Sequence, residues 1–97
     1  MASDVNELTV SYEQDGLCLV NELDKEVLTK GAWATIMFKY QELNRSKEEY
    51  GPVRFTIRRY RKINGQYRQQ SKFNISSKDQ AQKIIQTLQK WISEEDE

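Results

Sequence analysis

The chain has 97 residues, no histidine and one cysteine, and its 15 Lys and Arg residues balance its 15 Asp and Glu residues. This length supports a single domain with a modest core. Without histidine, the chain lacks the commonest general base and the usual zinc ligand, and its scattered glycines form no phosphate-binding loop. We therefore expect a protein that is not an enzyme and that uses no cofactor, metal or small-molecule substrate.

The first residues, the longest apolar run and the single cysteine predict the cellular compartment of the protein. The first ten residues have neither the basic region nor the apolar region of a secretory signal. The weakly polar run GAWATIMF is far too short to span a membrane, and the lone Cys18 favours a reducing compartment. We expect a cytoplasmic protein without a membrane contact. Residues 1–97 would form one domain, with residues 1–6 and 94–97 disordered.

The N-terminal half predicts strands. Residues 7–12, ELTVSY, alternate between apolar and polar side chains, and Asp15-Gly16 is a hairpin signal before the short strand LCLV. Residues 22–30 fit either a turn or the start of the next strand. Residues 32–43, AWATIMFKYQEL, predict a long strand with two faces: one has Ala32, Ala34, Ile36, Phe38 and Tyr40, and the other has Trp33, Thr35, Met37, Lys39 and Gln41.

Residues 53–75, VRFTIRRYRKINGQYRQQSKFNI, carry seven Lys and Arg residues and no acid. Two strands separated by Asn64-Gly65 fit a hairpin. A two-residue loop would mix apolar and charged side chains on both faces, which a half-buried sheet disfavours. We therefore predict a three-residue loop, 63–65, with Val53 opposite Ile75 and Phe55 opposite Phe73. The outward face is then cationic and rich in amides: Arg54, Thr56, Arg58, Tyr60, Lys62, Gln66, Arg68, Gln70, Lys72 and Asn74.

The C-terminal region predicts an amphipathic helix over residues 76–93. From Ala81 onward, apolar residues recur with the period of one helix face, and Ser77 with Gln80 forms a capping box. The fold class is therefore α+β. An antiparallel sheet of four or five strands, within residues 7–75, precedes one C-terminal helix, which we expect to pack on one face of the sheet.

The cationic face of the hairpin predicts a polyanion ligand, because surfaces selected only for solubility normally intersperse charges of both signs. Duplex readers usually insert a helix into the major groove, whereas this helix has its apolar face engaged in the core. We expect single-stranded nucleic acid, bound with little sequence preference by Arg54, Arg58, Tyr60, Lys62, Arg68 and Lys72, with Tyr60 stacking on a base. Tyr67, Tyr40 and Trp33 are further aromatic candidates, although a strand Trp is as often a core or dimer contact.

An alternative interpretation is a homodimeric protein-interaction module that docks an acidic partner on the cationic face, with Trp33 and Met37 as apolar anchors. A homodimer is also expected from the helix, because Trp91 and Ile92 extend beyond what a single short sheet covers. The alternating strands and the helix do not discriminate between these two functions.

Residues 53–92 resemble the C-terminal half of the single-stranded-DNA-binding transcriptional coactivators typified by positive cofactor four. The similar features are a strand ending in IRRY (57–60), a polar turn, a basic strand ending in KFNIS (72–76) and the helix SKDQAQKIIQTLQKWI (77–92). The resemblance implies a curved antiparallel sheet, a homodimer, and DNA rather than RNA held on the sheet. It implies binding roles for Arg58, Tyr60, Arg68 and Lys72.

Overall fold

The computed structural model describes residues 3–96. Its elements in chain order are a short 3-10 helix η1 (Val5–Glu7), strands β1 (Tyr12–Gln14), β2 (Leu17–Thr29), β3 (Trp33–Asn44), β4 (Glu49–Tyr50), β5 (Arg54–Ile63) and β6 (Gln66–Ile75), and the helix α1 (Lys78–Glu95). The predicted α+β class, an antiparallel sheet followed by one helix, is confirmed. Of the predicted disordered ends, residues 1, 2 and 97 lie outside the described residues. The others include part of η1 and the last residues of α1.

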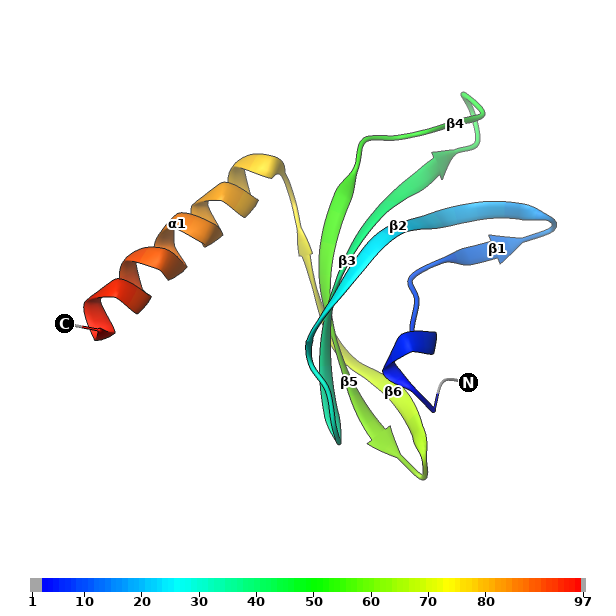
Figure 1. Ribbon diagram of the computed structural model, residues 1–97. Helices are drawn as coiled ribbons and strands as arrows, with labels where there is room; N and C mark the ends of the chain where they lie inside the picture. Colours follow the sequence, from blue (N-terminus) through cyan, green and yellow to red (C-terminus); the bar gives the residue numbers. More distant parts are fainter. Residues whose placement is uncertain (1–2, 97) are drawn as a thin grey trace.

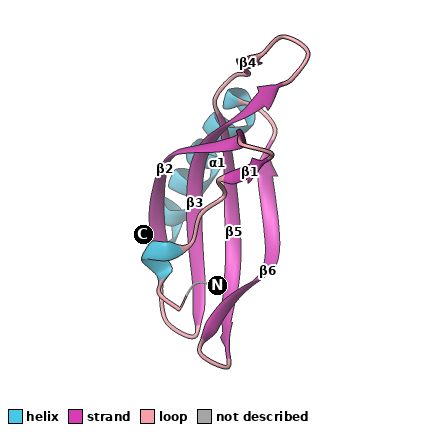
Figure 2. Ribbon diagram, turned by 90° about the vertical axis from the view of Figure 1, so that its right-hand side faces the viewer, coloured by secondary structure: helices cyan, strands magenta, loops and turns pink. Residues whose placement is uncertain are grey.

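The strands form one antiparallel sheet in the order β1-β2-β3-β5-β6, and the two-residue β4 pairs with the far end of β3. The sheet curls so that its concave face lies toward η1 and β1, while α1 stands on the convex side (Figure 1). Viewed from its side, the long strands run alongside one another, and β6 forms an edge (Figure 2). The acid-free hairpin therefore ends the sheet on one side.

The core lies on the concave face. Buried side chains from β3, β5 and β6 meet a segment that follows η1, and the cluster contains Leu8, Ala34, Ile36, Phe38, Tyr60 and Tyr67. The predicted division of the long strand into two faces is correct from Ala34 onward, because Ala34, Ile36, Phe38 and Tyr40 are all buried. Ala32, which was predicted on the same face, is exposed and precedes β3. The N-terminal segment is fastened by Lys25, whose Nζ donates to the carbonyl oxygens of Asn6 and Leu8, both at 2.7 Å.

Residues 22–30, which the sequence left open, belong to the 13-residue strand β2. Two register shifts against β3 leave Leu23 and Leu28 without a paired partner, and both side chains are exposed. A bulge adds one residue to one strand and bends it. The two bulges therefore explain why β2 lacks a clean alternation of apolar and polar residues.

The three-residue loop predicted for the β5–β6 hairpin is wrong. Ile63 pairs with Gln66, so the turn is the two-residue Asn64-Gly65, and both residues have positive φ, 52° and 79°. These are the conformations of a type I′ turn, which Asn and Gly tolerate. A register shift then follows, because Tyr60 pairs with Gln69 while Arg59 pairs with Ser71.

The shift leaves Gln70 as an extra residue on β6. Beyond it Phe55 pairs with Ile75 rather than with Phe73, and Ile57 pairs with Phe73. The bulge restores the grouping of apolar residues that a uniform two-residue register would have broken.

The predicted helix is confirmed, but its predicted packing on the sheet is wrong. The Ser77 hydroxyl accepts a 3.0 Å hydrogen bond from the backbone N–H of Gln80, and the Gln80 side chain accepts from the backbone N–H of Ser76. None of the side chains of Lys78–Glu95, all of which the structure describes, is buried. The helix extends away from the sheet on the convex side (Figure 1), whereas the buried core lies on the concave face.

Candidate nucleic-acid interface

Three of the predicted cations meet on the concave face, beside the buried core. Arg58 pairs directly with Lys72 across β5 and β6, and Arg54 lies four residues before Arg58 on the same face of β5. Arg54 and Lys72 are exposed, whereas Arg58 is half-buried. Like charges directly opposite each other on two strands are destabilising. A bound anion would therefore relieve the Arg58–Lys72 pair.

Arg58 is held in place by polar neighbours rather than pointing freely into water as predicted. Its Nε donates to the hydroxyl of Thr56 at 3.2 Å, and its guanidinium also donates to Oε1 of Gln69 at 3.0 Å. Thr56 is completely buried and donates in turn to Oδ1 of Asn74 at 2.7 Å. An arginine fixed by two side-chain hydrogen bonds loses little conformational freedom on binding an anion.

Tyr60 does not occupy the outward position that the sequence predicted. Its side chain is 5% exposed, because it pairs with Ala34 of β3 and so continues the buried face of that strand. Burial raises the pKa of the Tyr60 phenol above its usual value of 10, the nearby Glu22 adds to this rise, and Arg58 opposes it. Tyr60 is thus a core residue, and it cannot stack on a base without leaving the core.

A second cationic group lies on the convex face near the hairpin tip. Arg61 pairs with Trp33 on one side and with Arg68 on the other, so a ring and two guanidiniums form one row. The Arg59 guanidinium lies 4.2 Å and the Arg61 guanidinium 5.3 Å from the centre of the Trp33 ring. Both distances are within cation–π range. Trp33 remains 39% exposed, so part of its ring is open to a further planar group.

The remaining predicted cation, Lys62, lies next to the turn. Its Nζ is 5.4 Å from the centre of the Tyr67 ring, which is buried and belongs to the core. Lys62 is therefore separated from Arg58 and Lys72 by the Tyr60 position on β5. Its exposed head can contribute charge at the tip without being part of either row.

The charges are segregated across the sheet. Strands β5 and β6 carry no acid, whereas β2 carries Glu22, Asp24 and Glu26. The two like-charged pairs, Arg58–Lys72 and Arg61–Arg68, are on opposite faces of the same edge hairpin, because they differ in parity along β5. Cations therefore lie on both faces of the hairpin at the β6 edge, whereas acids lie on β2.

The structure regroups the sequence-predicted site. Arg54, Arg58 and Lys72 stay together on the concave face, Arg68 moves to the convex face, Lys62 is at the tip and Tyr60 is in the core. Arg59 and Arg61 are not on the outward face that the sequence predicted, and the sequence analysis therefore missed them. Their spacing of two residues, opposite a Trp on the neighbouring strand, is the signal that would have identified them once the pairing was known.

Among residues 3–96, no helix combines the length and the apolar character needed to cross a membrane. The same residues contain no group of three or more His, Cys, Asp or Glu side chains arranged to hold a metal ion. The chain matches no protein-family model, and it matches neither a curated protein nor a solved structure. The function must therefore be argued from the residues themselves.

Proposed function

We propose that the edge hairpin β5–β6 binds single-stranded nucleic acid with little sequence preference. The observation that carries this proposal is the presence of two directly opposed like-charge pairs, Arg58–Lys72 and Arg61–Arg68, on a hairpin without acid. Such pairs are unfavourable in the free protein and become favourable when a phosphate lies between or beside them. The sugar-phosphate backbone of the bound nucleic acid would follow the β6 edge.

The aromatic component of the interface is Trp33. A partly exposed indole flanked by the Arg59 and Arg61 guanidiniums can stack on an unpaired base while the cations contact the flanking phosphates. Trp33 takes the stacking role that the sequence analysis gave to Tyr60. Bases in a duplex are already stacked on one another, so this contact favours a single strand.

Duplex binding is disfavoured by the position of the charges. The helix α1 carries only Lys78, Lys83 and Lys90 as cations, and the charge-rich element is a curved strand edge. Readers of the duplex major groove usually insert a helix or a free two-stranded ribbon. The β5–β6 hairpin is not free in this sense, because β5 is paired with β3 from Arg54 to Arg61. The resemblance of residues 53–92 to the positive cofactor four-like coactivators supports the same ligand and favours DNA over RNA.

The proposal is tested by titrating fluorescent oligo-dT, oligo-rU and a matched duplex at several salt concentrations. If Arg54, Arg58, Arg61, Arg68 and Lys72 all contact phosphates, the log–log salt slope for the single strand should be about −3 to −4, at about −0.7 per contact. Arg61→Ala and Lys72→Ala should each reduce the slope by nearly one contact. Lys83→Ala, on the exposed polar side of α1, is the matched control and should leave it unchanged.

Trp33→Ala should weaken binding by about 1–3 kcal/mol without changing the salt slope, because stacking releases no counterions. Tyr12→Ala, which removes another exposed aromatic ring, is its control. Tighter binding to the duplex, or no binding of oligo-dT at low salt, would contradict the proposal. That result would favour an acidic protein partner docked on the same cations.

A further inference from the structure

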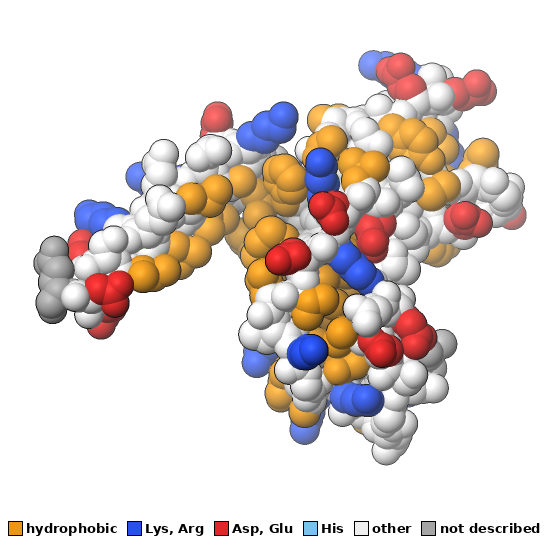
Figure 3. All heavy atoms as spheres, in the orientation of Figure 1, with side chains coloured by type: hydrophobic (Ala, Val, Ile, Leu, Met, Phe, Trp, Pro, Cys, Tyr) orange, Lys and Arg blue, Asp and Glu red, His pale blue; other side chains and the backbone are white. Residues whose placement is uncertain are grey.

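The helix α1 leaves an apolar stripe uncovered. The stripe contains Ile85, Leu88, Trp91 and Ile92, of which the last two are 58% and 59% exposed. These residues recur every three or four positions and so lie on one side of the helix. Figure 3 shows apolar side chains gathered along the lower side of α1 in this view. Uncovered apolar surface of this extent marks an interaction site in a folded protein.

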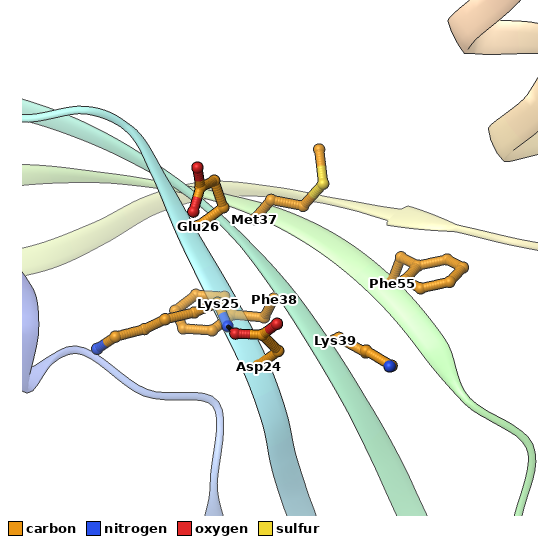
Figure 4. Close-up of a pocket in the computed structure, with 7 residues that line it drawn as sticks. All are labelled: Asp24, Lys25, Glu26, Met37, Phe38, Lys39 and Phe55. Carbon is orange, nitrogen blue, oxygen red and sulfur yellow. Dashed lines mark hydrogen bonds between the residues drawn. The ribbon is translucent and has the colours of Figure 1, made fainter.

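A second apolar surface lies on the convex face of the sheet. Met37, Ile57 and Phe73 pair in one row across β3, β5 and β6, and Phe55 lies two residues before Ile57 on the same face. We call these four residues the convex band. Beside it is an open hollow of about 210 Å³, lined by Met37, Phe38 and Phe55 together with charged residues of β2 and β3. Figure 4 shows Met37 and Glu26 projecting on the same side of the strands at this hollow.

We propose that the chain forms a two-fold symmetric homodimer in which the α1 stripe of each copy covers the convex band of the other. Each of these two apolar surfaces is incomplete in a single chain. A symmetric exchange covers both at once, because in an isologous contact each copy supplies the same two patches. The band and the stripe themselves contain none of the cations assigned to the ligand, but Arg59, which flanks Trp33, lies beside the band and is common to both proposals.

The spacing of the two surfaces is compatible. From Phe55 to Arg59 along β5 is about 13 Å, at about 3.3 Å per residue. From Leu88 to Glu95 along α1 is about 10 Å, at 1.5 Å per residue, and seven residues return to the same side of a helix. With Leu88 over Phe55, the Glu95 carboxylate comes within reach of the Arg59 guanidinium of the other copy. This charge complementarity fixes one direction for the exchanged helix.

A second copy is a better occupant of the band than the chain's own helix. Only Ser76 and Ser77 connect the buried Ile75 to α1, and both are engaged with Gln80 in the cap. This short connection directs α1 away from its own sheet (Figure 1). A helix of 18 residues is about 27 Å long and 10 Å wide. Since each copy contributes one helix and one band, the two-fold exchange makes two such helix-on-sheet contacts in one dimer.

The first test is disulfide trapping. In a Cys18→Ser background, the double variant Ile57→Cys with Ile92→Cys should oxidise to covalent dimers. The matched control pairs Ile57→Cys with Gln86→Cys on the polar side of α1 and should remain uncrosslinked. An internally crosslinked monomer would show that the helix folds onto its own sheet and would overturn the proposal. Absence of any crosslink in the double variant would equally overturn it.

The second test measures the oligomeric state by sedimentation and changes no residue of the convex band. By sedimentation at high micromolar concentration, the unmodified chain should have twice its 11.5 kDa mass. Leu88→Asp should sediment as a monomer while keeping its far-ultraviolet sheet signal, and Lys83→Ala should stay dimeric. A monomeric unmodified chain overturns the proposal. Oligo-dT binding, measured separately on the same proteins, shows whether the nucleic-acid proposal stands or fails on its own.

Discussion

The hydroxyl of Tyr67 on β6 donates a 2.6 Å hydrogen bond to the carbonyl oxygen of Gly31, 36 residues earlier in the turn between β2 and β3. The Tyr67 ring is buried in the core beside Leu8. Gly31 has a φ of 130°, a conformation that side chains disfavour. One side chain therefore ties the edge hairpin to the turn that precedes β3 and helps to hold the cationic tip against the rest of the sheet.

Tyr67→Phe should reduce the free energy of unfolding by about 1 kcal/mol, since it removes one hydrogen bond and keeps the ring. Urea unfolding followed by circular dichroism measures this change. Tyr12→Phe, at an exposed position, is the control and should be neutral. Equal stability of both variants would show that water replaces the Tyr67 hydroxyl at the Gly31 carbonyl.

Tyr60→Ala should destabilise the fold by about 3–5 kcal/mol, as other large aromatic-to-alanine changes in cores do. Tyr60→Phe should be far milder because it keeps the ring that packs beside Ala34. Chemical denaturation gives both values. If Tyr60→Ala retained parental stability and lost only oligonucleotide binding, Tyr60 would be the stacking residue after all.

Stability should also fall at alkaline pH through Tyr60. Because burial raises the pKa of Tyr60, its neutral phenol is favoured in the folded state. The contribution of the buried Tyr60 phenol to the free energy of unfolding is fully present below pH 10, where the phenol is neutral in both the folded and the unfolded state. It is lost as the pH rises from 10 toward the higher folded-state pKa, because the unfolded phenol ionises first. Between pH 9 and 11, the urea midpoint of Tyr60→Phe should fall less steeply than the midpoint of the unmodified chain.

Ser77→Ala should cost about 1 kcal/mol of helix stability, the usual effect of losing an N-cap side chain. Because no α1 side chain contributes to the core, the loss should appear as reduced helical ellipticity while the sheet signal is kept. Far-ultraviolet circular dichroism separates the two. Ser93→Ala, near the other end of α1, is a matched control. Simultaneous loss of sheet and helix signals would mean that the two elements unfold together.

Leu88→Ala tests whether the helix stripe is covered. In a single chain Leu88 is half-exposed, so its truncation should cost little at low protein concentration. In the proposed dimer the same side chain is buried, and the cost should approach the 2–5 kcal/mol typical of core leucines. Thermal unfolding at two concentrations distinguishes these cases. A midpoint difference from the parent that does not change with concentration would speak against dimer burial.

Much of the fold could be predicted from the sequence because its local signals agree. The alternation in β3 gave the correct buried face, and the period of α1 with its Ser77 cap gave the helix. The register of β5 and β6 depended on Gln70, a bulged residue that the alternation of side chains does not reveal. The extra residue Gln70 places the following side chains of β6 on the same faces as the predicted three-residue loop would have done.

The candidate site was harder to predict because β5 has two half-apolar faces. Phe55 and Ile57 look like the core side, yet Thr56 and Tyr60 are the buried residues, since they pair with the buried side of β3. The choice between the faces depends on which strand lies alongside, and that is a tertiary relationship. The apolar face that was taken for the core is the convex band, which in one chain is left partly open.

The edge strand β6 has a consequence for the behaviour of the protein in solution. An exposed strand edge is a template on which further strands can pair, and bulges and cations are the usual protection against such growth. Here Gln70 interrupts the edge, and Arg68 and Lys72 flank it on either side. A polyanion that neutralises these two cations removes half of that protection. If the proposed ligand binds there, the solubility of this chain is coupled to occupancy of its edge, and long ligands that recruit many copies would bring unprotected edges close together.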